Sequence, residues 1–322
     1  KQYIVGDLVI SSGFIWKCLV ANINIQPDPN TPSQAQWVQT TSNNAILNEV
    51  NYCAISGLAG DDQKALISQI PFKTPRAAIN YLKTKSGGVA KIMSINQTYT
   101  DAVGGAFTAC NNIVIDGGDE SDSIQSNPTN TLDYYMFMID CIGFTFKNLT
   151  WSAPGVGNEV LNTRGTSDNF TLQNINFVDK TGAGNSPVIS VGDAINPFGS
   201  HSFINCWMPP VDSNGISLIM SGPPKTNCII LIDNAGLTSK SWWNINNSTV
   251  TTGSNLTMII RNSYIATSNF SHTDGSTMIF TNCIFQGGGT FNSSASTGAL
   301  VLNSCSFFDP KTNTWCAVNI NM

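Results

Sequence analysis

The sequence has 322 residues, enough for one large domain or two modest ones with a substantial core. Only 11% of the residues are charged and the formal net charge is −5, while 37 Asn, 33 Ser and 30 Thr stand against three Glu. Because exposed helical positions favour Glu, Lys, Ala and Arg, this composition predicts an all-β protein, and the lack of any Lys/Arg cluster argues against nucleic acid as a partner.

The sequence also argues against a membrane span and a metal site. No apolar run reaches the roughly 20 residues of a membrane helix, so we expect no membrane insertion. The nine Cys are scattered without a CxxC pair, and His201 and His272 are the only histidines. This set does not match a structural zinc site, so we expect no metal, no other cofactor and mostly buried free thiols.

Residues 1–43 are predicted to form a small antiparallel β module. Apolar and polar residues alternate on both sides of the Ser-Ser-Gly at 11–13, which is typical of a hairpin. The order Gly6-Asp7-x-Val9, Gly13, Trp16-x-Cys18, Pro32 and Trp37 resembles small carbohydrate-binding modules of the chitin-binding type and short modules of phage tail proteins. The resemblance implies that Trp16 and Trp37 stack on sugars; the alternative is that both form the core of the module.

Residues 44–73 lack strong periodicity and are interpreted as a neck or linker. A short helix is expected next, because Thr74 can cap it, Pro75 suits its first turn, and Gly87-Gly88 can end it. Its apolar face would contain Ala78, Tyr81 and Leu82. An amphipathic helix followed by strands is typical of the cap of a solenoid, so residues 74–322 are predicted to be one domain.

Two phrases in this domain resemble a known fold. They are PFKT-x-x-AAI, followed by a Gly-rich turn and VAKIMSI, and NNIVIDGG at 111–118. Both resemble the first coils of right-handed parallel β-helices of the pectate-lyase-like class, which includes many phage tailspikes. The resemblance implies this architecture for residues 74–322 and a homotrimeric assembly.

A repeated phrase predicts stacked β-coils from the residues themselves. FTFKNLTW at 144–151 returns as FTLQNINF at 170–177, with apolar residues at period two on either side of a polar hinge. The hinges recur every 20–31 residues, at Asn148, Asn174, Asn205, Asn234, Asn262, Asn282 and Ser304. Asn tolerates the left-handed conformation of a sharp bend and can hydrogen-bond along a column, so the hinge is predicted to be structural.

The residue after the hinge is Cys in several copies. Cys283 and Cys305 are expected in successive coils, where either a disulfide or two stacked thiols is possible.

Residues between the repeats are the candidates for chemistry. The turn before each hinge strand is expected to form one wall, with Asp140, Arg164, Asp168, Asp193, His201, Lys225, His272 and Asp274. Asp168 and Asp193 could lie one coil apart, which is compatible with glycoside hydrolysis by paired carboxylates. The alternative is that both Asp only make the local hydrogen bonds that are common in turns.

The opposite wall is expected to carry Glu159, Asp212 and the tandem Trp242-Trp243. Strand alternation sends one Trp outward, where it can stack on a sugar whose hydroxyls bond to neighbouring polar residues. Alternatively, that Trp packs between subunits or under a loop. The acidic cluster at 117–122 lacks the ligand order of a calcium loop.

Together these observations predict an all-β chain with a small N-terminal antiparallel module, a short capping helix and a right-handed parallel β-helix. The first functional hypothesis is a phage-type tail fibre or tailspike on the virion surface, which binds host surface polysaccharide as a homotrimer beside other virion proteins. The second is a polysaccharide depolymerase, either a hydrolase or a lyase. The third is a structural virion spacer. The virus, the host and the sugar stay open.

Overall fold

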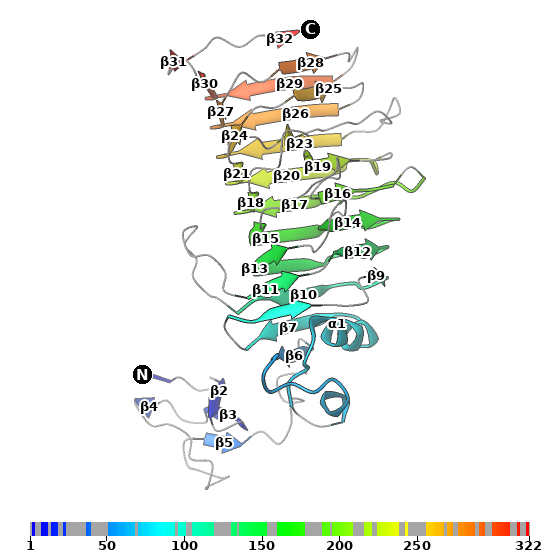
Figure 1. Ribbon diagram of the computed structural model, residues 1–322, viewed down its shortest axis with the longest axis vertical. Coiled ribbons are helices and arrows are strands. Elements are labelled where there is room, and N and C mark those ends of the chain that lie inside the picture. Colours follow the sequence, from blue (N-terminus) through cyan, green and yellow to red (C-terminus); the bar gives the residue numbers. More distant parts are fainter. Residues whose placement is uncertain are drawn as a thin grey trace.

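The computed structural model contains short N-terminal strands followed by a tall stack of coils (Figure 1). Of the first 50 residues it describes only these strands. It then describes residues 51–321 apart from gaps at 68–69, 94–95, 101–104, 119–129, 134, 153–159, 178–188, 194, 209–215, 221–223, 238–241, 244–255, 267–268, 273–275, 287–289, 294–297, 310–313 and 316–319.

The N-terminal strands are antiparallel, as predicted. β1 (Gln2–Tyr3) pairs with β4 (Asn22–Ile23), and β2 (Leu8–Ser11), β3 (Phe14–Cys18) and β5 (Trp37–Gln39) form a second small sheet. Ser11 lies opposite Phe14, so a two-residue connection joins β2 to β3 and the predicted hairpin is confirmed. Pairing of Trp16 with Gln39 and of Cys18 with Trp37 sets the two Trp positions diagonally on neighbouring strands.

The coils begin earlier than the sequence indicated. β6 (Tyr52–Ile55) is parallel to β7 (Gly88–Ile92), so the first coil begins within the segment 44–73, for which the sequence predicts a neck or linker. A strand of four residues is too short to show clear periodicity. A 3-10 helix over Lys64–Leu66 follows β6.

The predicted capping helix is α1 (Pro75–Thr84). The Thr74 hydroxyl accepts a hydrogen bond from the Ala77 amide at 3.2 Å, and Pro75 occupies the first turn. Ala78, Ile79 and Leu82 are buried, and the helix contacts β6, β7 and β10 at the lower end of the stack (Figure 1). Among the described residues, no helix is long and apolar enough to cross a membrane.

The strands of successive coils stack into three ladders, one on each face of the β-helix. The first ladder precedes the hinge and consists of β6, β7, β10 (Ile113–Asp116), β13 (Thr145–Ser152), β15 (Phe170–Phe177), β17 (His201–Ile204), β20 (Ile229–Asp233), β23 (Leu256–Arg261), β26 (Ser276–Thr281) and β29 (Gly298–Asn303). The second follows the hinge and consists of β8 (Thr98–Thr100), β11 (Thr131–Asp133), the ends of β13 and β15, β18 (Trp207–Met208), β21 (Gly236–Leu237), β24 (Tyr264–Ala266), β27 (Ile284–Gln286) and β30 (Ser306–Asp309).

The third ladder consists of β9 (Gly105–Thr108), β12 (Met136–Ile139), β14 (Leu161–Arg164), β16 (Ile189–Val191), β19 (Ile216–Met220) and β22 (Trp242–Trp243). β25 (Asn269–His272), β28 (Thr290–Ser293) and β32 (Ile320–Asn321) form a separate parallel sheet in later coils. The described pairs between successive coils are parallel, whereas β31 (Thr314–Trp315) is antiparallel to β30. The predicted parallel β-helix is confirmed.

The hinge residues adopt the conformation that the repeat predicted. All seven have a positive φ, between 51° and 58°. Asn174 donates its side-chain amide to Asn148 Oδ1 at 2.9 Å, and Asn234 donates to Asn205 Oδ1 at 2.9 Å. The column is interrupted at Asn262, which donates to Asp233 Oδ1 instead. The Asn column is therefore a structural ladder, with Asp able to replace Asn as the acceptor.

Aromatic side chains stack from coil to coil inside the helix. Phe144 stacks on Phe170 with ring centroids 5.9 Å apart, and His201 stacks on the other side of Phe170 at 5.7 Å. Cys283 is a buried free thiol and Cys305 a partly exposed one, so the stacked-thiol alternative holds for this pair. The repeat phrase thus encodes the core.

Candidate functional site

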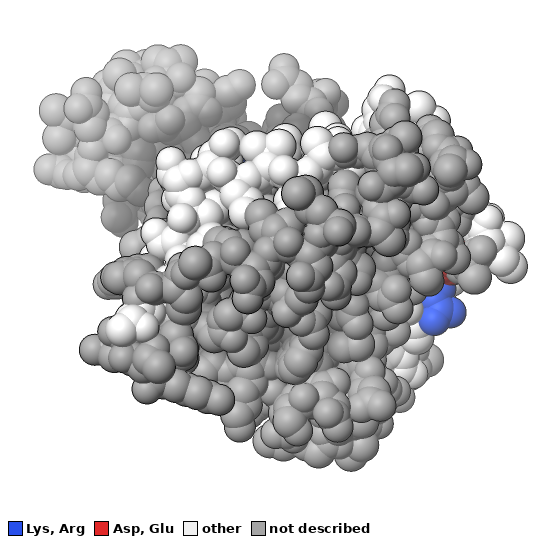
Figure 2. All heavy atoms as spheres, turned by 90° about the horizontal axis from the view of Figure 1, so that it is seen from above, with Lys and Arg blue, Asp and Glu red and all other residues white. Residues whose placement is uncertain are grey.

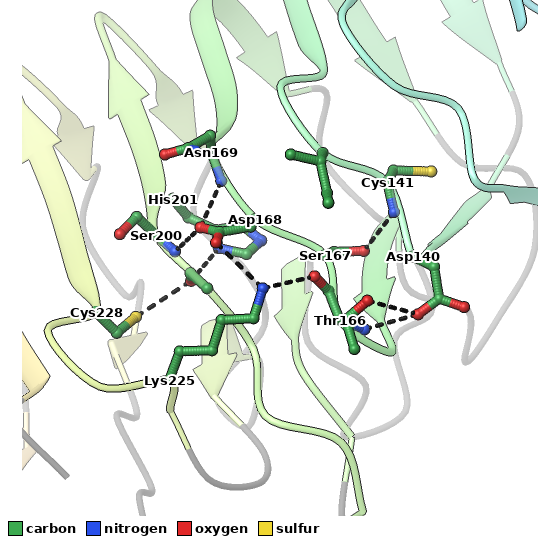
Figure 3. Close-up of polar contacts among 12 residues, drawn as sticks. Asp140, Cys141, Thr166, Ser167, Asp168, Asn169, Ser200, His201, Lys225 and Cys228 are labelled. Atoms are coloured by element: carbon green, nitrogen blue, oxygen red, sulfur yellow. Dashed lines mark hydrogen bonds and ion pairs between the residues drawn. The ribbon is translucent and has the colours of Figure 1, made fainter. Parts of the chain in front are cut away.

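A wall of turns with many polar contacts joins the third ladder to the first in the described stack. In four successive coils these turns lie between β12 and β13, β14 and β15, β16 and β17, and β19 and β20. We define the turn wall as four side chains of these turns, Asp140, Asp168, Asp193 and Lys225. Asp140, Asp168 and Lys225 are labelled in Figure 3. The sequence placed these four in one wall together with four other residues, and the structure agrees for these four. Of the others, His272 lies in β25 rather than in a turn, and Asp274 lies outside the described residues.

Asp168 connects three coils. Its Oδ1 accepts hydrogen bonds from the amides of Asn169 at 2.8 Å and Ser200 at 2.7 Å, the second of which lies in the next coil. Its Oδ2 lies 3.1 Å from Lys225 Nζ, which comes from the coil after that. Burial alone would raise the pKa of Asp168, but the hydrogen bonds from Ser200 and Lys225 outweigh it and hold the pKa below its usual value.

Lys225 completes this link. Besides Asp168, its Nζ donates to the carbonyl oxygen of Thr166 at 2.9 Å, so the ammonium group bridges two points of one turn (Figure 3). Gly199 is required next to the carboxylate, because a Cβ at this position would lie 2.1 Å from Asp168 Oδ1. The geometry makes Asp168 and Lys225 a rigid clasp between coils.

Asp193 and Asp140 make similar contacts. Asp193 accepts from the amides of Ile195 and Asn196 in its own turn and from the Gly165 amide of the preceding coil at 2.8 Å. Burial would raise the pKa of Asp193, but these amide hydrogen bonds lower it to about 2. Asp140 accepts from the amide and the hydroxyl of Thr166. Each carboxylate therefore joins one coil to the next.

The suggested catalytic pair, Asp168 and Asp193, lies on adjacent coils of the same wall. The residues aligned with Asp168 in the next coil are Gly199 and Ser200, however, because the Asp193 turn is longer. A glycosidase acid needs a raised pKa, and the pKa values of both carboxyl groups are lowered. These contacts favour the local turn role that the sequence left as the alternative.

His201 and Arg164 lie in strands rather than in turns. His201 begins β17 and is buried, with Nδ1 2.9 Å from the Gly199 carbonyl oxygen and Nε2 2.9 Å from Thr163 Oγ1. The carbonyl fixes the proton on Nδ1, so Nε2 accepts from the Thr163 hydroxyl. Burial lowers the pKa of His201 to about 4, and the ring is neutral at pH 7. Arg164 ends β14.

The outer surface of the first ladder changes chemistry along the stack. The residue three positions before each hinge points outward and is half-buried, and the coils align these residues in one column. We call this the outer column: Thr145, Thr171, Ser202, Leu231, Ile259, Ile279 and Val301. Hydroxyl side chains thus occupy the three coils of the Asp140, Asp168 and Asp193 turns, between the aliphatic Val89 and Val114 of the two coils before them and the aliphatic side chains of the four coils that follow.

The hydroxyl part of the outer column belongs to a larger polar area. We call it the polar window and define it by Thr145, Asn169, Thr171, Gln173, Ser200 and Ser202. Seen from above, along the stack, the described atoms in view are uncharged apart from a basic side chain that lies next to an acidic one at the edge (Figure 2). The polar window was not predicted from the sequence, although aligning the repeats three positions before the hinge reveals Thr145, Thr171 and Ser202.

Other predicted site residues are only partly described. Trp242 and Trp243 form β22, which pairs with β19 through a register shift, and so belong to the third ladder. Glu159 and Asp212 lie outside the described residues, as do the side chains of Trp16, Trp37, Trp242 and Trp243 and the acidic residues Asp119, Glu120 and Asp122. Within the part of the chain that the structure describes, no three His, Cys, Asp or Glu residues are arranged to hold a metal ion.

Comparisons with known proteins concern the fold. No protein-family model matches the chain, and no curated protein matches its sequence. One similar solved structure is the tailspike protein gp49 from Acinetobacter baumannii bacteriophage Fri1, a capsular polysaccharide depolymerase, with 14% identity and a TM-score of 0.47 over 92% of this chain. The chain spans 57% of the length of that protein.

Two further solved structures are similar at lower levels. ORF18 of Geobacillus virus E2 has 11% identity and a TM-score of 0.29, over 96% of this chain and 68% of that one. Tailspike protein 3 of bacteriophage CBA120 has 9% identity and a TM-score of 0.29, over 97% of this chain and 75% of that one. Likenesses of this size do not establish an activity.

Proposed function

We propose that this protein is a phage-type tail fibre or tailspike of the virion surface, and that its β-helix binds host surface polysaccharide at the polar window. The observation that carries the proposal is the change along the outer column, from Thr145, Thr171 and Ser202 to aliphatic residues at otherwise equivalent positions. The same position of the coil thus carries a hydroxyl side chain in some coils and an aliphatic side chain in others. This division suits a rod that exposes one part to a polar ligand and covers the other with protein.

The polar window suits a polysaccharide because it repeats along the stack. Its hydroxyl and amide groups recur at about the 4.8 Å spacing of adjacent strands, so several can meet successive groups of an extended ligand. The strands hold these groups in place, which lowers the entropy cost of ordering them on binding. Uncharged donors and acceptors match sugar hydroxyls better than they match a phosphate backbone, which requires clustered positive charge.

The aliphatic part of the outer column supports assembly from several copies of the chain. Leu231, Ile259, Ile279 and Val301 form a continuous row on an outward face, and Ile229, on the same ladder, is 44% exposed. Burying such surface against another copy is favourable by about 25 cal/mol per Å². We propose that three copies bury this row, and that the trimer binds a polymer with avidity.

The Trp residues remain part of the proposal as additional sugar platforms. The strand register sets Trp16 and Trp37 on neighbouring strands of the N-terminal sheet, as a shared platform would require. Trp242 and Trp243, with Glu159 and Asp212, would form another carbohydrate-binding area. The likeness of residues 1–43 to chitin-binding-type modules supports the first of these areas.

The polar window can be tested by removing hydroxyls without changing shape. In the double variant Thr145→Val and Thr171→Val, we expect binding to immobilised host capsular or cell-wall polysaccharide to weaken about tenfold or more, since each lost hydrogen bond contributes roughly 1 kcal/mol. The matched control is Thr257→Val with Thr277→Val, two half-buried Thr residues paired on the same ladder in later coils. Equal effects in both pairs would place the site elsewhere, and a wild-type protein that binds no host glycan would rule out the function.

Cleavage is tested by incubating the protein with the same host polysaccharide in solution. Polysaccharide chain length is followed by size-exclusion chromatography, with Asp168→Asn and Asp193→Asn compared with wild type. Shortening that persists in both variants would exclude these residues as the catalytic pair, and a constant chain length would favour binding without hydrolysis or lysis.

The proposed trimer is tested with the same substitution in the aliphatic part and in the hydroxyl part of the outer column. Ile259→Asn is expected to lower the molar mass measured by light scattering from trimer to monomer. Thr171→Asn, at the same position in the polar window, is the control and should leave the mass unchanged. A wild-type monomer at micromolar concentration would contradict the proposed trimer.

A further inference from the structure

A second cluster of recognition side chains lies on the outer face of the third ladder. Phe137 of β12 points outward between the buried Met136 and Met138, and Tyr135 lies against it edge-to-face with ring centroids 5.6 Å apart. In the next coil, the guanidinium carbon of the exposed Arg164 lies 4.7 Å from the centre of the Phe137 ring. Two aromatic rings and an Arg side chain therefore form one surface feature.

Arg164 is held in a fixed orientation. Its Nε donates to Asn162 Oδ1 at 3.1 Å, and Asn162 is a buried residue of the same strand. With Nε bound and the guanidinium carbon over the Phe137 ring, the guanidinium group has restricted freedom to rotate. The terminal nitrogens of an oriented guanidinium form a planar pair of donors that fits a carboxylate.

Within the described residues, Arg164 also lacks the ionic partner that Lys147, Lys225 and Arg261 have. Lys147 is paired with Asp116, Lys225 with Asp168, and Arg261 with Asp233 at 2.7 Å. No acidic side chain among the described residues forms an ion pair with Arg164.

The nearest acidic residues of the turns have other partners. Asp140 binds Thr166, and Asp193 binds the Gly165 amide, which directly follows Arg164. Among the described residues, this guanidinium on its aromatic support has no ionic partner, so it is available to an external anion.

We infer that Tyr135, Phe137 and Arg164 form a binding site for the carboxylate of an acidic sugar, such as a uronic acid unit of a polysaccharide. The inference rests on the proposed function and adds a ligand class to it. Arg164 supplies the two donors for the carboxylate, and Tyr135 supplies an aromatic edge and a phenol group beside the sugar ring. Arg164 ends β14, and Asn169 and Thr171 of the polar window follow on the other side of the 165–168 turn, so one polymer crossing this turn would contact both areas.

The test compares an acidic oligosaccharide with its neutral counterpart. Tri-galacturonate and a glucuronate-containing hexasaccharide are titrated by NMR and calorimetry, each beside its carboxyl-reduced form, in which the carboxylate has become a hydroxymethyl group. We expect the acidic forms to bind about tenfold or more tightly than the reduced forms, because charge-assisted hydrogen bonds are stronger than neutral ones. Arg164→Gln should abolish this difference, and Arg164→Lys should restore only part of it.

The control is Arg261→Gln, which removes an equal charge from an Arg that is already neutralised by Asp233. It should leave the preference for the acidic forms unchanged. Phe137→Leu, which removes the stacking ring but keeps Arg164, should weaken binding without abolishing it, and circular dichroism verifies the fold of each variant.

The inference is overturned by any of three results: equal binding of acidic and reduced sugars, an unchanged preference in Arg164→Gln, or no binding of either acidic probe at millimolar concentration. Loss of polysaccharide binding in the Thr145 and Thr171 variant with retention in Arg164→Gln would leave the proposed function standing without this site.

Discussion

Asp168 provides the sharpest test of the distinction between scaffold and chemistry in this protein. Its carboxylate accepts hydrogen bonds from two backbone amides and pairs with one ammonium group. These groups come from three coils, so we expect Asp168 to act as a clasp that holds the coils together. Asp168→Ala removes all three interactions at once. Asp168→Asn keeps an oxygen acceptor for the amides but removes the charge that attracts Lys225.

The expected losses can be estimated from the contacts. The part-buried Ser200 amide, left without an acceptor, costs roughly 2 kcal/mol, and the exposed Asn169 amide costs about 0.5 kcal/mol. The ion pair with Lys225 has side chains 30% and 26% exposed and contributes roughly 0.5 kcal/mol. Asp168→Ala should therefore lower the free energy of unfolding by about 3 kcal/mol, and Asp168→Asn by about 1 kcal/mol.

Urea unfolding followed by circular dichroism measures these differences at pH 7 and pH 3. The pKa of Asp168 is lower in the folded protein than in the unfolded chain, so its stabilisation is present at neutral pH and is lost as the pH falls through the folded pKa. The gap between wild type and Asp168→Ala should shrink at acidic pH. An alanine variant within about 0.5 kcal/mol of wild type would refute the clasp, and an asparagine variant of full stability that no longer shortens a glycan would identify a catalytic group.

Three further predictions concern the scaffold. The unfolded chain protonates His201 near pH 6.5 while the folded chain does so near pH 4, so stability should fall as the pH drops between these values; His201→Phe with Thr163→Val should flatten that slope in urea titrations, and an unchanged slope would exclude His201 as its source. Asn174→Ala should cost roughly 2 kcal/mol through its left-handed φ and its lost ladder bond, measured by thermal unfolding, whereas Asn174→Gly should cost less; equal losses would mean that backbone strain is not the cause. Gly199→Ala should destabilise about as much as Asp168→Ala, because its methyl group would displace the carboxylate; a stable variant in the same urea assay would contradict the close approach.

The repeat could be predicted because each coil obeys local rules. Apolar residues two and four positions before the hinge and one and three after it must face one side of each strand, as Phe144, Phe146, Leu149 and Trp151 do. The hinge needs a left-handed residue, and Asn148 provides one. Both requirements act within eight residues, so they can be read from a single copy and checked against the others.

The site was harder to predict because its contacts join different coils. Asp168 and Lys225 are 57 residues apart in sequence, and loops of unequal length separate them. The sequence could therefore predict that Asp168 and Asp193 lie one coil apart, but only the structure shows that Gly199 and Ser200 are aligned with Asp168. A catalytic Asp and an Asp that accepts hydrogen bonds from backbone amides look identical in a sequence. Only the groups that the side chain contacts in the folded protein distinguish them.

By itself, the sequence determined the solenoid, its capping helix, its hinges and its core, because period-two alternation and left-handed bends are properties of short segments. The tertiary structure decided which residues of different coils meet, because that depends on the register of stacked strands and on the path of each turn. Stacking brings Lys225 to Asp168 in the turn wall and aligns the hydroxyl and aliphatic residues of the outer column. It also places the Arg164 guanidinium over the Phe137 ring of the preceding coil.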